Sequence, residues 1–553
     1  MSVRLQNLEA QVIHFFKRYG KYIIGGLIAG LLSYFMMMAC NLVNHVDGIW
    51  HPSNFIAGDW EISLGRGLQR YSDKLRFGIV SDPFNILLTL LMLTTGNAIV
   101  IMKFERITSC EAACVSNATK HVQAATAGCE SSVHFDSKIY KGLFITSLIA
   151  NPVVCNLLSY SYLAVNYALA YLLSIVCFGF VRTNMEDKKK VLAGVLMGGA
   201  SLGLSMALYQ TYICVTCVLM AMYIIKMVLD GKKLRGIFQY IASCACTGVF
   251  GAVVYLIVNK ALLFRAGVEM ASYRGADNIS PLLILKELPN SLKECYLQCW
   301  DYFYHGKAAS NLQYVDIILA GLFCVYLVAA VIQFVKLWKG SKVHAVLFAV
   351  MLLLLPVASC VILLIAVGNT MSGLMSVGMV VCVVMLGIII PGEKKTGFWM
   401  KRIYYLLLVA FTWYQLMAVI NDQVALKEGK TATINLAENV VSQLYEGGYI
   451  DEFQQVAFVG RPGDNDRFAK SAAFYMANDY ARFGCWSMDA RNNRASWAGV
   501  LANFVGVNMN LCDVADYHKL VGMERVINMP QFPLEGSIQV IDDIVVVKIA
   551  DLN

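Results

Sequence analysis

Three carboxylates and two arginines lie close together in one polar stretch of the chain, residues 41–83. The carboxylates are Asp47, Asp59 and Glu61, and the arginines are Arg66 and Arg70. A carboxylate can take the proton of an attacking hydroxyl, and an arginine can bind phosphate oxygens through two parallel hydrogen bonds. These residue types therefore suit a reaction between a hydroxyl and a lipid phosphate. The alternative is a solvated loop whose arginines snorkel to the membrane surface.

The stretch lies between the first two apolar runs that are long enough to cross a bilayer. From Leu64 onward its spacing predicts an amphipathic helix. One face carries Leu64, Leu68, Tyr71 and Leu75, and another carries Arg66, Arg70 and Asp73. Such a helix beside a span usually lies in the membrane interface. Acids just ahead of it also favour a helix N-terminus, which is the alternative role for Glu61.

The composition of the whole chain indicates a polytopic α-helical membrane protein. Of its 553 residues 58% are hydrophobic and 15% are charged, whereas soluble domains are nearer half apolar and a quarter charged. The net charge of +8 does not indicate nucleic-acid binding, because most Lys and Arg residues stand in short loops between spans, where they set orientation.

Apolar runs of about 20 residues predict eleven spans. They lie near 21–43, 84–103, 141–157, 162–181, 191–207, 210–228, 237–258, 314–335, 343–366, 372–390 and 402–420. With this count the basic clusters at 17–21, 188–190, 232–235, 336–342 and 394–402 all face the same side. The positive-inside rule then places the N-terminus in the cytoplasm and the residues after 420 outside.

Three polar segments lie outside these spans. Residues 104–140 are expected to form a cytoplasmic insertion with a structural role, a helical pair with no visible chemistry. Residues 259–313 form an external loop whose aromatic helix is either a sugar platform or an interfacial belt. Residues 421–553 predict a small extracytoplasmic α/β domain, with helices at 434–447, 465–483 and 493–504 and a strand at 455–460. A hairpin turn is predicted at Asp542–Asp543, between two β-branched runs.

The sequence contains no Cys/His framework for a metal. Asp464-Asn465-Asp466 imitates a metal-binding DxD motif, but its Gly/Pro loop favours ordinary turn chemistry. A divalent metal stays open as a cofactor, and no other cofactor is predicted. Cys485 and Cys512 would form a disulfide if the compartment is oxidising.

Two observations weigh against energy-coupled transport. The chain has no GxxxxGK[ST] motif, and its spans hold almost no acids, which ion-coupled transporters place at the midplane. The acids lie instead in the first external loop, which favours an enzyme acting on a lipid-linked substrate. A flippase, polymerase or ligase of surface polysaccharide is the alternative.

Several short motifs resemble the type II O-antigen glucosyltransferase (Gtr) family, with its GT-C-like architecture. The motifs are Asp47 as the loop-one acid, LGRGL at 64–68, DPFNILLTLLML at 82–93, ANPVVCNLLSYSY at 150–162 and LYQ at 208–210. After LSY the family tends to carry an arginine and an acid, where this chain has Ser161 and Leu163.

The resemblance implies a bacterial inner-membrane glycosyltransferase that uses a polyprenyl-phosphate hexose, with glucose as the expected sugar. The acceptor would be an extracytoplasmic glycan or lipid-linked glycan, and a companion donor synthase and flippase would supply the donor. Asp47 would be the base, with Asp59 and Glu61 as further candidates, and Arg66 and Arg70 would hold the phosphate. The substrate contacts implied are Trp60, Asn151, Tyr160, Tyr209 and Gln210.

Overall fold

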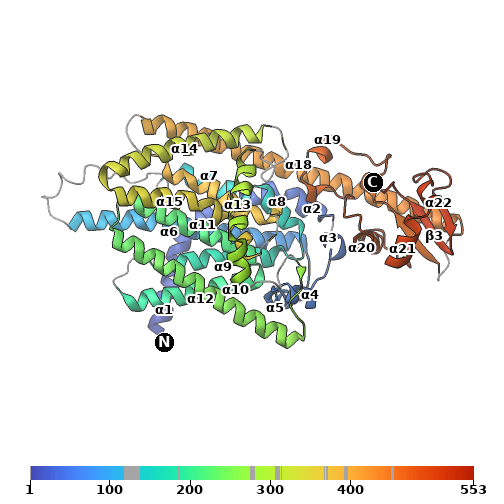
Figure 1. The fold of residues 1–553 in the computed structure, drawn as a ribbon, viewed down its shortest axis with the longest axis horizontal. Coiled ribbons are helices and arrows are strands. Elements are labelled where there is room, and N and C mark those ends of the chain that lie inside the picture. The colour runs from blue at the N-terminus through green and yellow to red at the C-terminus, as the bar shows by residue number, and fades with distance from the viewer. Residues whose placement is uncertain are drawn as a thin grey trace.

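The computed structural model describes residues 2–45, 47–117, 137–182, 187–273, 281–304, 312, 314–366, 368, 371–391, 396–449 and 454–552. The fold is mostly helical, at 75%, with a small C-terminal sheet. A long helical bundle occupies one end of the molecule, and the C-terminal domain projects from the other end (Figure 1).

The bundle is built from helices of very different lengths. They are α1 (Ser2–Ser33), α2 (Phe35–Cys40), α6 (Asp82–Asn117), α7 (Lys138–Ile149), α8 (Pro152–Ser159), α9 (Ala164–Phe180), α10 (Lys188–Leu208), α11 (Ile213–Leu229), α12 (Leu234–Ala266), α14 (Val315–Gly340), α15 (Lys342–Ser359), α16 (Ile362–Ile365), α17 (Val377–Met385) and α18 (Thr396–Glu446). A further helix, α13 (Pro281–Tyr304), crosses their direction (Figure 1).

Within the described residues, eight helical segments are long and apolar enough to cross a membrane. The other three of the eleven predicted spans are less regular. The run 21–43 is divided between α1 and α2, which are separated at Tyr34. Ala164–Phe180 and Gly373–Ile389 are apolar but shorter than a full span. The structure thus supports a membrane protein with eight candidate spans and does not fix the count at eleven.

The segment Lys138–Ser159 lies at the centre of the bundle, with 83% of its apolar window buried, whereas Leu234–Ala266 is peripheral at 22%. The central segment is divided into α7 and α8 at Asn151. Pro152 has no N–H and favours an extended residue before it. Asn151 is accordingly extended, and its side chain accepts the N–H of Val154 to cap α8.

One unbroken helix of 51 residues, α18, joins the bundle to the C-terminal domain. The predicted span 402–420 and the predicted helix 434–447 are therefore parts of a single helix. Nothing in residues 421–433 breaks it, because they contain no proline and only one glycine, Gly429.

The C-terminal sheet has three strands in the order β1 (Gln455–Val459), β3 (Ile544–Lys548), β2 (Ile538–Ile541). β1 and β3 are parallel, and β2 and β3 are antiparallel. The predicted hairpin is confirmed: Asp542 and Asp543 join β2 to β3 with φ values of 48° and 59°, which suits a two-residue turn.

The helices of this domain differ from those predicted. In place of a helix over 465–483 there is only a short one, α19 (Ala472–Met476), and a single turn at Asp479–Ala481. The run 493–504 is covered by α20 (Ala490–Val500) and a π-helical turn at Leu501–Val505. The remaining short helices are α21 (Val514–Val521) and α22 (Glu524–Ile527). Two of these helices begin where a side chain caps them: Ser471 caps α19, and Asp489 caps α20.

Two further expectations have structural outcomes. Cys485 and Cys512 are both free thiols, so the disulfide left open by the sequence is absent. Asp464 pairs with Arg461 at 2.7 Å within its own turn, and Asn465 donates to the carbonyl of Phe532. In the insertion, α6 continues to Asn117, and 118–136 lie outside the described residues.

Candidate functional site

Asp47 opens a four-residue helix, α3 (Asp47–Trp50), in the loop between α2 and α6. The backbone N–H of Asn44 donates to the carbonyl of Ser159 at 3.0 Å. The side-chain oxygen of Asn44 accepts the N–H of Gly48, also at 3.0 Å. These bonds hold the turn against the end of α8, at the end of the bundle that faces the C-terminal domain (Figure 1).

The Asp47 carboxylate is half-buried among groups from three parts of the chain. Tyr162 hydrogen-bonds to it, and the charges of Arg66 and Glu61 act on it. Burial raises the pKa of Asp47 above the usual aspartate range, and Glu61 adds to the rise, while Arg66 and Tyr162 oppose it. Because the net shift in pKa is upward, Asp47 is a stronger base than a surface aspartate.

Arg66 lies in the turn between α4 (Asp59–Ser63) and α5 (Leu68–Leu75). Gly65 makes this turn with a φ of +76°, a conformation that side chains disfavour. The Nε of Arg66 donates to Oε1 of Gln210 at 3.4 Å, and its guanidinium lies 4.9 Å from the centre of the Tyr209 ring. Gln210 and Tyr209 thus orient Arg66 without neutralising it.

The arginines of this loop differ in their partners. Arg70 pairs with Asp59 at 2.7 Å, and Arg76 pairs with Asp73 at 2.6 Å. Arg66 forms no ion pair with any residue that the structure describes. It is therefore the cation of the three that remains available to a phosphate.

A series of tyrosines surrounds Asp47 and Arg66. The ring of Tyr160 lies 6.4 Å from that of Tyr162 and 6.3 Å from that of Tyr167, and the Tyr167 and Tyr209 rings are 4.5 Å apart. Tyr255 adds its hydroxyl, which accepts from Nε2 of Gln210 at 3.2 Å. Ligand sites in proteins are typically lined by aromatic side chains with a few placed polar groups.

The other acids of the loop have local partners. Glu61 supplies the carboxylate half of a capping box at the start of α4, where its Oε2 accepts the N–H of Gly58 at 2.7 Å. This is the helix-start role considered as the alternative for Glu61. Asp59 is 63% exposed and holds Arg70 at the rim of the loop. Trp60 is also exposed, and its ring meets that of Tyr273 at 5.7 Å.

Asn151 has a different place from the other predicted contacts. Its side chain is buried, caps α8 and donates to the carbonyl of Ser147 at 3.1 Å. Both polar groups of this side chain are thus occupied within the protein. The structure brings together Asp47, Glu61, Arg66, Tyr160, Tyr209 and Gln210. Asp59, Arg70 and Trp60 lie in the same loop, and Asn151 lies apart from them at the start of α8.

The amphipathic helix begins later than predicted. It begins at Leu68 because Gly65 interrupts the helix before it. Leu75 is 84% exposed, whereas Asp73 is fully buried. Asp73 accepts from the N–H of Ala57 at 2.9 Å and from Asn166 at 2.8 Å. Asp73 therefore packs on the protein, whereas Tyr71 and Leu75 stay exposed, as an apolar face directed at the membrane interface would be.

The sequence analysis missed Tyr162, Tyr167, Tyr255 and Asp73. Of these residues, Tyr162 could most easily have been found from the sequence, because it stands two residues after Tyr160 in the LSYSY run. Tyr167 and Tyr255 are distant in sequence from the loop and join it only through the packing of α9 and α12.

The aromatic helix α13 divides its rings between two environments. Tyr302 is fully buried, while Trp300 and Tyr304 are exposed and stack with ring centres 5.3 Å apart. No contact in the described structure links these rings to Asp47 or Arg66. Both expectations for this helix, a sugar platform or an interfacial belt, thus remain.

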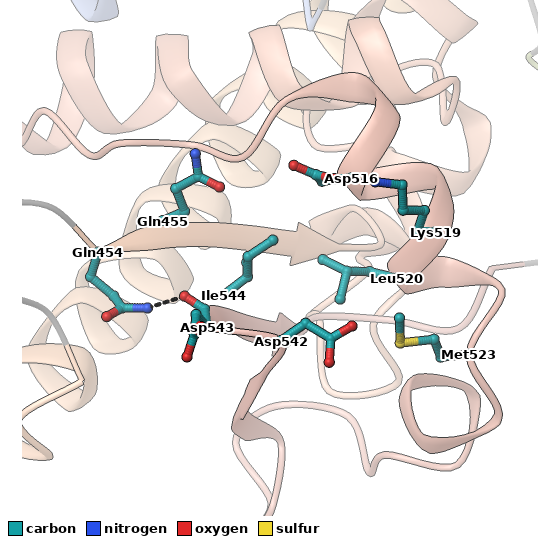
Figure 2. A pocket seen from close by; sticks show the side chains of 9 residues that line it. All are labelled: Gln454, Gln455, Asp516, Lys519, Leu520, Met523, Asp542, Asp543 and Ile544. Carbon is teal, nitrogen blue, oxygen red and sulfur yellow. Dashed lines mark hydrogen bonds and ion pairs between the residues drawn. The ribbon is translucent and has the colours of Figure 1, made fainter.

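A groove of about 560 Å³ lies on the C-terminal domain (Figure 2). It is lined by the starts of β1 and β3 and by α21, with Asp516 bonded to Lys519 at 2.8 Å. Gln454 donates to the carbonyl of Asp543. Figure 1 places β3 at the end of this domain far from α3, so the groove is not part of the Asp47 site. In the part of the chain that the structure describes, no group of three or more acids, histidines or cysteines is arranged to hold a metal.

A comparison with protein families gives one match. The family described as glucosyl transferase GtrII matches residues 52–390. The matched region contains Arg66, Tyr209 and Gln210, whereas Asp47 and the C-terminal domain lie outside it. No curated protein matches the chain, and no solved structure matches it.

Proposed function

Since the chain belongs to the glucosyl transferase GtrII family and is therefore a glycosyltransferase, we propose that it transfers glucose from a polyprenyl phosphate to a glycan or lipid-linked glycan. The observation that carries this proposal is the combination of Asp47 and the unpaired Arg66 in one site lined by tyrosines. A base and a phosphate-binding cation are the two groups that this reaction needs.

In the proposed reaction, a hydroxyl of the acceptor attacks the anomeric carbon of the donor sugar. Asp47 takes the hydroxyl proton as the new C–O bond forms. The bond between the sugar and the phosphate oxygen breaks, and the polyprenyl phosphate leaves with the electron pair. Arg66 stabilises the charge that develops on that phosphate, because its guanidinium fork matches two phosphate oxygens.

We place this reaction on the extracytoplasmic side of a bacterial inner membrane. Helix α10 supports this side: it begins at Lys188, within a basic cluster, and ends at Leu208, beside Tyr209. Its 21 residues span about 31 Å, so the cluster and the site lie at opposite ends of the bundle. If the positive-inside rule holds for Lys188–Lys190, Asp47 faces outward.

The test is a transfer assay with the full-length protein in liposomes. Polyprenyl-phosphate glucose is supplied together with a lipid-linked glycan acceptor, and the product is weighed by mass spectrometry. A mass gain of one hexose with wild-type protein, and none without the donor, is expected. Translocation of the intact donor without a new glycan product would instead support the flippase alternative.

A further inference from the structure

The loop that carries Asp47 is held from two sides. On the membrane side, Asn44 bonds to Ser159 at the end of α8. On the other side the contacts come from α18 and the C-terminal domain. Lys430 donates to the carbonyl of Asn41 at 2.9 Å, and His45 hydrogen-bonds to the backbone of Tyr480. The start of the loop, at Asn41 and His45, is thus tied to parts of the chain more than 380 residues away.

The closest of these outer contacts is at α3 itself. Gly499 of α20 is buried against Ile49, which is fully buried. A Cβ at position 499 would lie 2.6 Å from Cγ2 of Ile49, 3.1 Å from Cδ1 of Trp50 and 3.2 Å from the carbonyl oxygen of Ile49. Glycine is therefore required for α20 to approach α3 this closely.

The turn that follows α20 adds a polar contact. Leu501–Val505 is a π-helical turn, a local form that is frequent at functional sites. From this turn, Nδ2 of Asn503 donates to the carbonyl of Ile49 at 2.8 Å. The last carbonyls of a helix have no partner within the helix, so Asn503 supplies one of the bonds that α3 lacks.

From these contacts we infer that α20 and its π-turn position Asp47, so the C-terminal domain completes the catalytic site rather than standing apart from it. Gly499 and Asn503 are positioning residues, because they touch α3 and not the substrate. Neither they nor Asp47 falls within the family match at residues 52–390. The inference rests on the proposed function for the role of Asp47, but the contact itself can be tested without any transfer assay.

The test compares Gly499→Ala with Gly522→Ala in the full-length protein. A Cβ at Gly522 would meet nothing closer than 3.6 Å, so this variant controls for the substitution within the same domain. Gly499→Ala is expected to lower kcat by about 10- to 100-fold, since a shift near 1 Å at a reacting group has that effect. The KM for the lipid donor should stay near wild type, because Arg66 is not moved.

Two more variants separate positioning from a loss of folding. Asn503→Ala removes one bond and is expected to lower kcat by about twofold to tenfold. Asn492→Ala, in the preceding helix α20 and bonded to Asp489, should have no effect. Ile49→Ala in the Gly499→Ala background removes Cγ2 and should restore part of kcat. Thermal stability is measured for every variant.

Hydrogen–deuterium exchange of residues 44–50 is the readout that does not depend on transfer. Exchange should rise in Gly499→Ala and Asn503→Ala and stay unchanged in both controls. Unchanged exchange together with wild-type kcat in both variants would overturn the inference. If exchange rises but wild-type protein transfers no glucose, the contact stands and the proposed function fails.

Discussion

Arg66 acts on the charge of Asp47 without forming an ion pair with it. Its guanidinium lowers the pKa of Asp47 against the opposing effect of burial, yet no ion pair joins the two residues, while Arg70 and Arg76 in the same loop both have carboxylate partners. A direct ion pair would hold Asp47 in its deprotonated form and occupy the arginine fork. The separation keeps a base and a phosphate-binding cation available in one site.

The first prediction concerns Asp47→Asn, which keeps the side-chain shape and removes the proton acceptor. Transfer should fall by about a hundredfold or more, with donor binding unchanged. Thermal stability should be equal or slightly higher, because burial penalises the charged form of Asp47. Initial rates and a thermal melt check both points. A near wild-type rate in this variant, with a lost rate in Asp59→Asn, would assign the base to Asp59.

The second prediction is a pair of opposite shifts in the pH profile. Because the pKa of Asp47 is raised, the rate should fall with decreasing pH at a pH above the ordinary aspartate value of about 3.9. Glu61→Gln removes a negative charge that raises the pKa of Asp47, so the acidic limb of the pH–rate profile should move to lower pH. Tyr162→Phe removes a hydrogen bond that lowers this pKa, so the limb should move to higher pH. Shifts of the same sign in both variants would contradict this environment for Asp47.

The third prediction compares two lysine substitutions. Arg66→Lys should lose about tenfold or more in transfer, since a point charge does not reproduce the two parallel bonds of a guanidinium. Arg70→Lys should stay close to wild type, because it keeps a cation beside the exposed carboxylate of Asp59. Donor titrations with each variant measure the effect. Full activity of Arg66→Lys at unchanged donor affinity would show that Arg66 does not bind the donor phosphate.

The fourth prediction uses a glycine pair with similar backbone angles. Gly65→Ala places a Cβ 2.4 Å from the Tyr255 hydroxyl and 3.0 Å from Nε2 of Gln210, at a φ of +76°. Gly267→Ala has a φ of +67° and nothing within 4 Å. Both should lose about 1–2 kcal/mol of stability, but only Gly65→Ala should also weaken donor binding, because Gln210 orients Arg66. Equal donor affinity in the two variants would show that Gln210 does not orient Arg66 for donor binding.

The fifth prediction is topological. Asp542 and Lys233 are both exposed, and the proposed orientation places them on opposite sides of the membrane. Asp542→Cys should react with an impermeant maleimide in intact cells from which reactive native cysteines have been removed. Lys233→Cys should react only after permeabilisation. The reverse pattern would show that the site faces the cytoplasm, which would exclude the proposed extracytoplasmic acceptor.

Sequence patterns predicted the parts of the fold that depend on local chemistry. The hairpin at Asp542–Asp543 followed from two acids between β-branched runs. The helix-start role of Glu61 was expected from its place ahead of a helix beginning at Leu64, whereas the structure places this residue inside α4. The start of α5 could not be predicted from its apolar spacing, since Gly65 breaks the helix. The burial of Asp73 could not be predicted either, since its partner Asn166 lies 93 residues away in the sequence. The tyrosines of the site depend in the same way on how α9 and α12 pack.

The unbroken helix α18 has a consequence for how this chain can change during evolution. Each residue inserted into an α-helix rotates everything beyond it by about 100° and advances it by about 1.5 Å. A single insertion between the bundle and the C-terminal domain would therefore turn Gly499 away from Ile49, although it would alter no residue of the site. Recombination that exchanges C-terminal domains between relatives must keep the number of residues in α18, because even a seven-residue insertion, which nearly restores the rotation, would lift the domain about 10 Å from α3.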